Sequence, residues 1–466
     1  MARSLAPEDQ QLFDRLRTEL EQASPRFQRA DSYFDGAQKL EQLGLAIPDD
    51  LMKFTVLVNW PRLAVDARTE RLEVKGFSLP GSDDLDADLW GMWQSNNMDE
   101  KDVMSRLDFE VFGRSYLCVG SPDSNGDDPI ITAESPYNII TDRDPRTLAL
   151  TSSVRLYDYD QTDKQSRRAT LYKPNETIWL VRDGSQWLYD GDPDDHGVGQ
   201  VMVAPAFRGR RTALPDFRTL QGTSAMADVI PISDAAARNL TNAQIGQETH
   251  AVPARGVLGA TKGDFVDADG NPLPTWQAYF GSVWSLANPD AKTFQFDASD
   301  MKNFETMHTL YAKTAAGVAA LPPNYMGLAT DDAASADAIR SRESRLVRSV
   351  ELDQIALGNA REQAMRLAMR IKDGKWSEDA KRMECLWYDA GTPTYASRVD
   401  AVVKQFAVTD GNGRPLISRR SALEELGWSP TRITRELDRL DAEVNIDPYL
   451  ANINAKDLNS GTPNAS

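Results

Sequence analysis

The sequence predicts an α+β protein in which amphipathic helices surround an antiparallel sheet. Residues 7–22 place apolar side chains at helical spacing. After Gly113, short β-rich segments alternate with turn residues up to about residue 189, and helical patterns return from residue 300. The 41% hydrophobic and 26% charged fractions are those of a folded chain, and 466 residues suffice for about three domains.

Three helices are expected in the first 112 residues. They cover residues 7–22, 51–72 and 89–112, where leucines, valines and aromatic residues recur among charged ones. A connection rich in Gly, Pro and Asp separates the second helix from the third, at residues 77–88. The N-terminal region therefore begins as a helical layer.

A run of short strands follows Gly113. Each combines β-branched or aromatic residues with flanking Asp, Asn, Gly or Pro, which is typical of strands joined by tight turns. We expect strands at residues 116–119, 130–133, 154–159, 169–172, 177–181 and 187–189. Their close spacing favours an antiparallel sheet fed by helices.

The middle of the chain alternates helix, small β module and helix. Residues 232–248 are rich in Ala and predict a helix, which Pro253 ends. The module at residues 254–297 contains candidate strands at 255–258, 282–286 and 293–296 and a turn at 267–271. A second helix is expected at residues 300–320.

Pro322 and Pro323 end that helix, and a polar, flexible segment follows at residues 324–337. A long helix is expected at residues 338–372, with a natural bend at Gly358–Asn359. The last elements predicted are a strand at 384–388, two helices at 395–407 and 418–426, the second trailing into 430–444, and a disordered tail at 452–466.

Charge and cysteine usage limit the classes of protein. The formal net charge of −18 argues against a surface that wraps phosphates with basic residues. Cys118 and Cys385 are distant in sequence and form no zinc motif, so a reducing compartment is expected. The first eleven residues do not resemble a signal peptide, and no apolar run approaches the roughly 18 residues of a membrane span.

Catalytic motifs are absent from the sequence. It contains no GxxxxGK[ST] phosphate loop, HExxH zinc motif or GxSxG nucleophile motif. The strongest metal-like cluster is Asp194, Asp195 and His196, although its Gly-rich surroundings favour a solvated loop tip. A metal-dependent nuclease or transferase that uses this cluster is the alternative function.

Two further charged groups permit more than one interpretation. Residues 267–271 look superficially like a calcium loop, but Phe265 and Trp276 occupy its first and twelfth ligand positions, so a hairpin turn is the better interpretation. Four arginines, Arg340, Arg342, Arg345 and Arg348, concentrate positive charge on the long helix. Intrahelical pairing with Glu343 and Glu351, or a subunit contact, is favoured over DNA binding. Because neither the Asp194–Asp195–His196 cluster nor the segment at 267–271 is favoured as a metal site, and no cofactor motif is present, we expect no metal and no cofactor.

Several local strings, in this order, resemble the portal proteins of tailed bacteriophages of the siphophage type. They are YFDG (33–36), NWPRLAVDARTERLEVKGF (59–77), LWGMWQSN (89–96), GRSYLCV (113–119), ESPYNIITDRDP (134–145), DAAARNL (234–240) and ISRRSALEELG (417–427). No string is a catalytic signature. Their order along nearly the whole chain, and the succession of helix, β module, helix, loop and long helix, produce the resemblance.

The resemblance implies a portal-like fold with named regions. Residues 1–223 would form most of the wing, 224–249 and 300–321 the two stem helices, and 250–299 the clip between them. Residues 322–337 would be the tunnel loop, 338–415 the remaining wing with its long helix, and 416–451 a short crown. The short C-terminal region departs from portals with an extended crown.

The resemblance also implies function and partners. A dodecameric ring at one capsid vertex would pass double-stranded DNA, without sequence specificity, during genome packaging and ejection. It would dock first the terminase and later the head–tail adaptor, and would contact major capsid and scaffolding proteins but no membrane. We expect assembly in the host cytoplasm and residence in the virion.

Two sets of site residues follow from the resemblance. The tunnel loop would present Asn324, Tyr325, Met326, Thr330, Asp331, Asp332 and Ser335 to the channel. The clip would present Asp267, Asp269, Asn271 and Trp276 to terminase or adaptor. An acidic loop suits a conduit, because each phosphate neutralised by the protein adds affinity that retards sliding.

Overall fold

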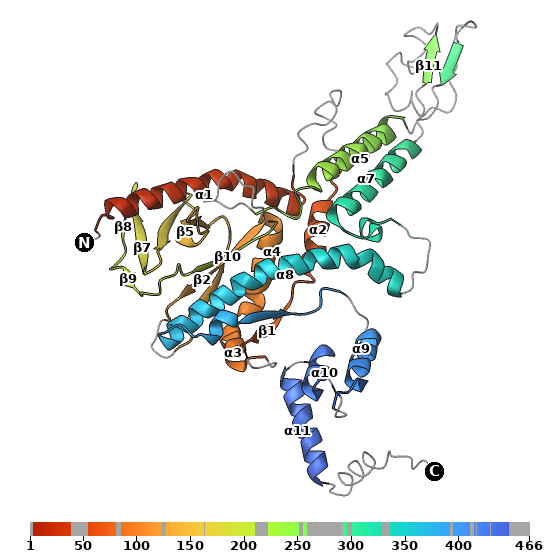
Figure 1. The fold of residues 1–466 in the computed structure, drawn as a ribbon. Helices are drawn as coiled ribbons and strands as arrows, with labels where there is room; N and C mark the ends of the chain where they lie inside the picture. Colours follow the sequence, from red (N-terminus) through yellow and green to blue (C-terminus); the bar gives the residue numbers. More distant parts are fainter. Residues whose placement is uncertain are drawn as a thin grey trace, which may run out of the picture. The chain divides into compact units, whose positions relative to one another are not determined.

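The computed structural model describes residues 3–38, 55–80, 85–122, 127–162, 164–209, 222–250, 255–258, 290, 292–295, 301–328, 336–391, 395–410, 414–415, 417–428 and 430–446. The chain divides into two compact units. The first comprises Met1–Gly81 and Leu85–Ala390, and the second comprises Ser82–Asp84 and Gly391–Ser466. Mixed helix and sheet is confirmed as the fold class (Figure 1).

The helices of the first unit are α1 (Pro7–Phe34), α2 (Trp60–Thr69), α3 (Ala87–Ser95), α4 (Met98–Phe112), α5 (Ile230–His250), α7 (Lys302–Ala319) and α8 (Ala336–Asp373). Two 3-10 helices, η3 (Pro323–Met326) and η4 (Asp379–Arg382), lie on either side of α8 in sequence. None of the helices among the described residues has an apolar stretch long enough to cross a membrane.

The largest sheet has the order β4-β5-β6-β7-β8, with β9 paired to β7. Its strands are β4 (Ile139–Arg143), β5 (Leu150–Asp160), β6 (Gln165–Tyr172), β7 (Glu176–Asp183), β8 (Gln186–Tyr189) and β9 (Asp194–Asp195). Helix α1 lies across one face (Figure 1), and its Phe13, Leu16 and Leu20 pack on Val154 and Leu171 of that face. The amphipathic pattern of α1 is therefore explained by burial against this sheet.

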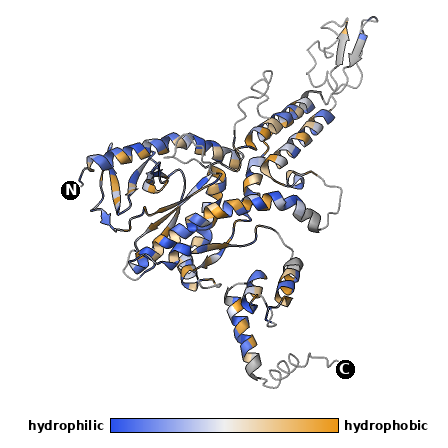
Figure 2. Ribbon diagram, viewed as in Figure 1, coloured by the Kyte–Doolittle hydropathy of each residue, from blue (hydrophilic) through white to orange (hydrophobic). Residues whose placement is uncertain are grey.

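The first unit also contains a three-stranded sheet. Strands β10 (Val203–Phe207), β2 (Arg114–Gly120) and β3 (Ile130–Glu134) are antiparallel in that order. The C-terminal half of α8 packs on them, and its Ala364, Met365 and Ala368 are buried in the same core as Tyr116 and Val203. Figure 2 shows hydrophobic and hydrophilic residues alternating along α8, as expected of a helix with one buried face.

Helices α5 and α7 form a closely packed pair. The contact is built from small residues, because Ala236 and Ala237 of α5 and Ala312, Ala315 and Ala316 of α7 are all buried in one core. Side chains this small allow two backbones to approach closely. Between these helices in sequence, β11 (Arg255–Leu258) pairs antiparallel with β12 (Lys292–Gln295).

The prediction of one helix over residues 89–112 was wrong. The structure has two helices, α3 and α4, because Asn97 adopts a left-handed conformation with φ of 53° between them. Asn96 explains the interruption, since its side chain donates to Pro129 O (2.9 Å) and accepts from Ile131 N (2.7 Å). A helix break is stabilised when such side-chain bonds replace the lost backbone bonds.

Three other expectations were incomplete. Helix α1 runs twelve residues beyond the predicted end at residue 22, with Pro25 inside it. The strands occupy several sheets rather than one, and β1 (Val74–Ser78), which pairs with β13 (Glu384–Trp387), overlaps a segment predicted as connection. At Gly358 a Cβ atom would lie 3.3 Å from Trp387 Nε1, so close packing against β13 accounts for this glycine.

The second unit is a small helical body. It contains α9 (Tyr395–Ala407), α10 (Arg419–Glu425) and α11 (Pro430–Ile446). The helix predicted at 395–407 is confirmed, and the second predicted helix is divided into α10 and α11. Helix α10 contacts both of the other helices, and Val402, Ala422 and Ile433 are buried. The predicted strand at 282–286 and the tail at 452–466 lie outside the described residues.

Candidate functional site

The end of α7 and the chain that follows it form the candidate functional site of the first unit. As predicted, Pro322 and Pro323 end the helix, and residues 323–326 form the single turn η3. Ala320 and Gly327 adopt left-handed conformations on the two sides of this turn. The chain therefore turns sharply after the end of α7, and two buried arginines, Arg68 of α2 and Arg71 just after α2, hold the two ends of residues 320–328.

Helix α2 has a well-defined beginning. The side chain of Asn59 caps it by accepting from Arg62 N at 3.4 Å, and Pro61 occupies its first turn. Both residues are typical of a helix N-terminus. This fixed start places Arg68 on the buried side of α2, and Arg71, which lies two residues after the end of the helix, is buried as well.

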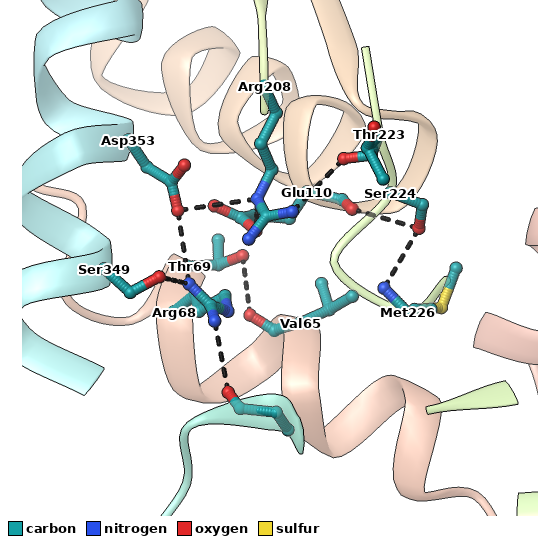
Figure 3. A network of polar contacts seen from close by, with 11 residues as sticks. Val65, Arg68, Thr69, Glu110, Arg208, Thr223, Ser224, Met226, Ser349 and Asp353 are labelled. Atoms are coloured by element: carbon teal, nitrogen blue, oxygen red, sulfur yellow. Dashed lines mark hydrogen bonds and ion pairs between the residues drawn. The ribbon is translucent and has the colours of Figure 1, made fainter. Parts of the chain in front are cut away.

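Arg68 connects α2 to α7 and α8 (Figure 3). Its Nη2 donates to the carbonyl of Ala319, the last residue of α7, at 3.1 Å. Its Nη1 donates to Asp353 Oδ2 at 3.3 Å and also to Ser349 Oγ, both on α8. One guanidinium thereby satisfies an end carbonyl of α7 and fixes that end against the middle of α8.

A second ion pair extends this network to α4. Asp353 Oδ2 lies 3.5 Å from Arg208 Nε, and Arg208 Nε lies 3.0 Å from Glu110 Oε2. We call Arg68, Asp353, Arg208 and Glu110 the buried charge network. Two arginines and two carboxylates compensate one another there, as buried ions require.

Gly113 makes the approach of these groups possible. It ends α4 with φ of +75°, and a Cβ atom there would lie 2.6 Å from the backbone of Gly222 and Thr223. The Gly113 carbonyl accepts from Arg208 N at 2.9 Å, while Arg208 Nη1 donates to the carbonyl of Thr223 at 3.2 Å. Glycine is therefore required both for the turn and for the close passage of the chain.

Glu110 is the most perturbed acid of the network. Its side chain is fully buried. Burial raises the pKa of Glu110 to about 8, because the cost of burying the charged form, together with the nearby Asp353 carboxylate, outweighs the attraction of Arg208 and Arg68. Glu110 is therefore the acid of the network that takes up a proton most readily.

Arg71 holds the η3 turn. Its Nη2 donates to Tyr325 Oη at 2.9 Å and lies 3.4 Å from Glu343 Oε1 of α8. Tyr325 Oη donates to the same Glu343 oxygen at 3.0 Å. Leu321 and Met326 are buried beside them. The two ends of residues 320–328 are thus fixed, one by Arg68 and the other by Arg71.

The predicted tunnel-loop residues fall into two groups. Asn324 is exposed, Tyr325 is half-buried in the Arg71–Glu343 contact, and Met326 is buried. Thr330, Asp331, Asp332 and Ser335 lie outside the described residues, as do the predicted clip residues Asp267, Asp269, Asn271 and Trp276. Their assignment to a channel or docking surface stays a prediction. The sequence contained no signal that would have identified Arg68 or Arg71 as the anchors.

The Asp194–Asp195–His196 cluster has an ordinary structural role in the described part of the chain. Asp194 and Asp195 form strand β9, paired with Glu176 and Thr177 of β7. His196 Nδ1 accepts from Val198 N at 3.2 Å, and burial lowers the pKa of His196 in spite of the two neighbouring carboxylates. No group of three potential metal ligands occurs among the described residues.

Nucleophilic chemistry has no support around this cluster either. His196 lies at a cleft of about 520 Å³ together with Arg155, Tyr172 and Cys118. Burial raises the pKa of the Cys118 thiol, so it remains protonated and unreactive. Arg155 is held by Glu134 at 2.8 Å. The lining has the composition of a packed junction between two sheets.

Comparison with known proteins identifies relatives along nearly the whole chain. A family model described as "Phage portal protein, SPP1 Gp6-like" matches residues 14–443. The portal protein of Mycobacterium phage L5 is 36% identical over 433 residues, which cover 91% of this chain and 86% of the phage L5 protein. The portal protein of Mycobacterium phage D29 is 35% identical over 444 residues, with coverage of 93% and 89%.

Solved structures show a more distant likeness. A chain from the neck of an empty gene transfer agent particle, computed with C6 symmetry, aligns with a TM-score of 0.44 at 12% identity. The alignment covers 83% of this chain and 95% of the other. A chain of the native gene transfer agent virion aligns with a TM-score of 0.43 at 13% identity, covering 86% and 99%.

Arg68→Ala is expected to lower the free energy of unfolding by about 3 kcal/mol, because the buried Asp353 would lose one of its two arginine partners and the Ala319 carbonyl would lose its donor. Arg62→Ala is the matched control, since Arg62 lies on the same helix in an exposed pair with Asp66 and should change the same quantity by less than about 1 kcal/mol. Chemical denaturation of both variants measures the difference. Equal effects of the two substitutions would contradict the anchoring role of Arg68.

Glu110→Gln is expected to change how stability depends on pH. The raised pKa of Glu110 means that the folded protein binds a proton that the unfolded chain releases, so the wild type loses stability as pH rises from about 4.5 to about 8. Glutamine cannot lose a proton. Between these two pH values, the free energy of unfolding of the variant minus that of the wild type should therefore increase by at least about 1 kcal/mol. Denaturant titrations across this range measure the gain, and parallel pH profiles would refute the raised pKa.

Proposed function

Because the chain belongs to the SPP1 Gp6-like family of phage portal proteins, we propose that it forms a twelve-subunit ring that conducts double-stranded DNA at one capsid vertex. Its family membership rests on the match over residues 14–443 and on the two mycobacteriophage relatives. The protein is a structural portal subunit of an oligomeric ring in the virion neck, and the metal-dependent enzyme has no support. The match along the chain is the observation that carries the function.

The proposed regions follow the order of elements. In this proposal α5 and α7 belong to the two stem regions at residues 224–249 and 300–321, and β11–β12 belongs to the clip at 250–299. Their alanine contact supports this assignment, because it makes the two helices one stiff unit. A stiff stem would transmit a movement of the clip to the anchored end of α7.

The wing is proposed to combine residues 1–223 with residues 338–415, and the crown to comprise 416–451. The packing of α1 and α8 on the two sheets of the first unit supports a shared wing. The division between the compact units falls at Gly391, so residues 391–415 belong to the second unit although they are proposed as wing. The short second unit agrees with a small crown.

The tunnel loop is proposed at residues 322–337. Arg71 and Arg68 support this role, because they fix the start of the loop to α2 and α8. A loop with a fixed base can hold its tip at a constant distance from DNA. The acidic residues Asp331 and Asp332 would repel phosphates, so the loop would guide DNA without releasing the counterions that produce tight binding.

The proposed partners act at different stages. Terminase would dock first, at the clip residues Asp267, Asp269, Asn271 and Trp276, and the head–tail adaptor would replace it. Major capsid and scaffolding proteins would surround the wing during assembly in the host cytoplasm. Neither a cofactor nor a sequence-specific DNA contact is part of the proposal, and the net charge of −18 supports the absence of strong DNA binding.

The ring is tested on the purified protein alone and after coexpression with its capsid and scaffolding proteins. Native mass spectrometry should give a closed oligomer of twelve subunits, and negative-stain images should show a central hole. A closed ring with another number of subunits would contradict the dodecamer but would still support a ring. Absence of any closed ring under both conditions would contradict the proposed function.

The paired substitution Asp331→Lys and Asp332→Lys is expected to lower the amount of DNA packaged. The physical reason is that lysines would bind passing phosphates and retard sliding. Asp331→Asn with Asp332→Asn is the matched control, because it removes the charge without attracting DNA. Packaged DNA is measured in particles complemented with each variant. Equal yields for the lysine variant and the wild type would refute the guiding role of this loop.

A further inference from the structure

Helix α8 carries apolar side chains on a side that no part of the described first unit covers. Leu352 is 54% and Ile355 is 60% exposed, although both are large aliphatic residues. Arg345 and Arg348 extend the same side toward the N-terminal end of the helix. Single exposed leucines are ordinary, but aliphatic residues three apart beside two arginines form a patch with a defined chemistry.

The patch continues onto α7. Arg345 Nη1 donates to the carbonyl of Gly317 at 2.9 Å, which places this arginine at the border between the two helices. Leu310 and Val318 of α7 are 53% and 42% exposed. We call Leu310, Val318, Arg345, Arg348, Leu352 and Ile355 the basic face, since its two charged residues are arginines.

Helix α4 presents a patch of the opposite charge. Val103 and Met104 are 46% and 58% exposed, and the exposed acids Asp99 and Glu100 lie one turn before them. The neighbouring Lys101 does not neutralise the acids at close range, because its Nζ donates to the carbonyl of Ile131 at 3.2 Å. We call Asp99, Glu100, Val103 and Met104 the acidic face.

The two faces point away from each other in one subunit. Arg361 of α8 and Asp102 of α4 form a buried ion pair, with Nη2 and Oδ1 2.5 Å apart, so each of these residues marks the side of its helix that faces the other helix. At about 100° per residue, Leu352 and Ile355 lie about 120–180° around α8 from Arg361. Glu100, Val103 and Met104 lie about 100–160° around α4 from Asp102, and Asp99, at about 60°, lies at the edge of the acidic face.

We propose that the basic face of one subunit packs against the acidic face of the next copy of this chain. A closed ring needs two different, complementary patches on each subunit, because its contacts are heterologous. Apolar residues with opposite charges on opposite sides of the subunit meet this requirement. The inference rests on the oligomeric ring of the proposed function and names the residues that hold it together.

The charges would mainly determine how the two subunits align at the contact. Exposed ion pairs contribute little to affinity, but like charges brought together across an interface prevent the wrong alignment. The aliphatic groups would supply the area removed from water. Arg348 can change partner at small cost, since its present contact with Glu351 at 2.7 Å is an exposed pair on one helix.

The test is a charge-reversal cycle in the full-length protein. Arg345→Glu with Arg348→Glu should weaken each subunit contact roughly tenfold, which corresponds to about 1.4 kcal/mol per contact. Because a closed ring repeats this loss at every contact, the fraction of subunits in rings should fall sharply. Asp99→Lys with Glu100→Lys should do the same. The variant that carries all four substitutions should recover ring formation, because every contact in its ring again joins opposite charges.

Recovery cannot come from within one chain, since the two faces lie on opposite sides of the subunit. Arg167→Glu with Arg168→Glu, a double reversal on the exposed part of β6, is the matched control and should leave the rings unchanged. Native mass spectrometry measures ring fraction, and thermal unfolding verifies that each variant is folded.

The outcomes separate the inference from its premise. Absence of rings in the wild type under every assembly condition would contradict the proposed function itself. Wild-type rings that persist in both double reversals would refute the contact. Loss of rings without recovery in the fourfold variant would also overturn it. If Arg345→Glu with Arg348→Glu lowers the melting temperature of the monomer but leaves the rings unchanged, the contact is refuted, and another segment of the same chain covers the basic face.

Discussion

The buried charge network is the interaction on which the first unit depends. Arg68, Asp353, Arg208 and Glu110 come from four separate parts of the chain; Arg68, Asp353 and Glu110 are buried, and Arg208 is partly buried. Such a group gives little net stability compared with a well-packed apolar core. Its consequence is a single permitted arrangement, because any displacement of α2, α4 or α8 leaves a charge unpaired in the interior.

This constraint explains how the turn after the end of α7 is held in place. A helix that ends at Ala319 exposes carbonyls that need donors, and Arg68 provides one from a different helix. Arg71 then fixes the η3 turn through Tyr325. The donors come from α2 and from Arg71 just after it, and the start of α2 is set by Asn59 and Pro61 some ten residues earlier. The loop base is therefore positioned by a helix far from it in sequence.

The helices and most strands were predictable because their signals are local. Hydrophobic spacing, Pro322–Pro323 and the turn residues after Gly113 each act within a few residues. The break at Asn97 was missed, since it depends on bonds from Asn96 to residues 129 and 131. The pairing of β1 with β13 joins segments about 300 residues apart. The anchoring arginines were also missed, because surface and buried arginines look alike in sequence.

The same distinction between local and distant contacts clarifies how charge is used in this protein. Arg68 and Arg71 are buried and make contacts within the subunit, whereas Arg345 and Arg348 on α8 are exposed. Asp353 lies on the same helix, but on its buried side. One helix thus presents charges to the interior on one side and to solvent on the other. A change in the position of α8 would affect both sides together, so the subunit fold and any contact made by its outer face are mechanically linked.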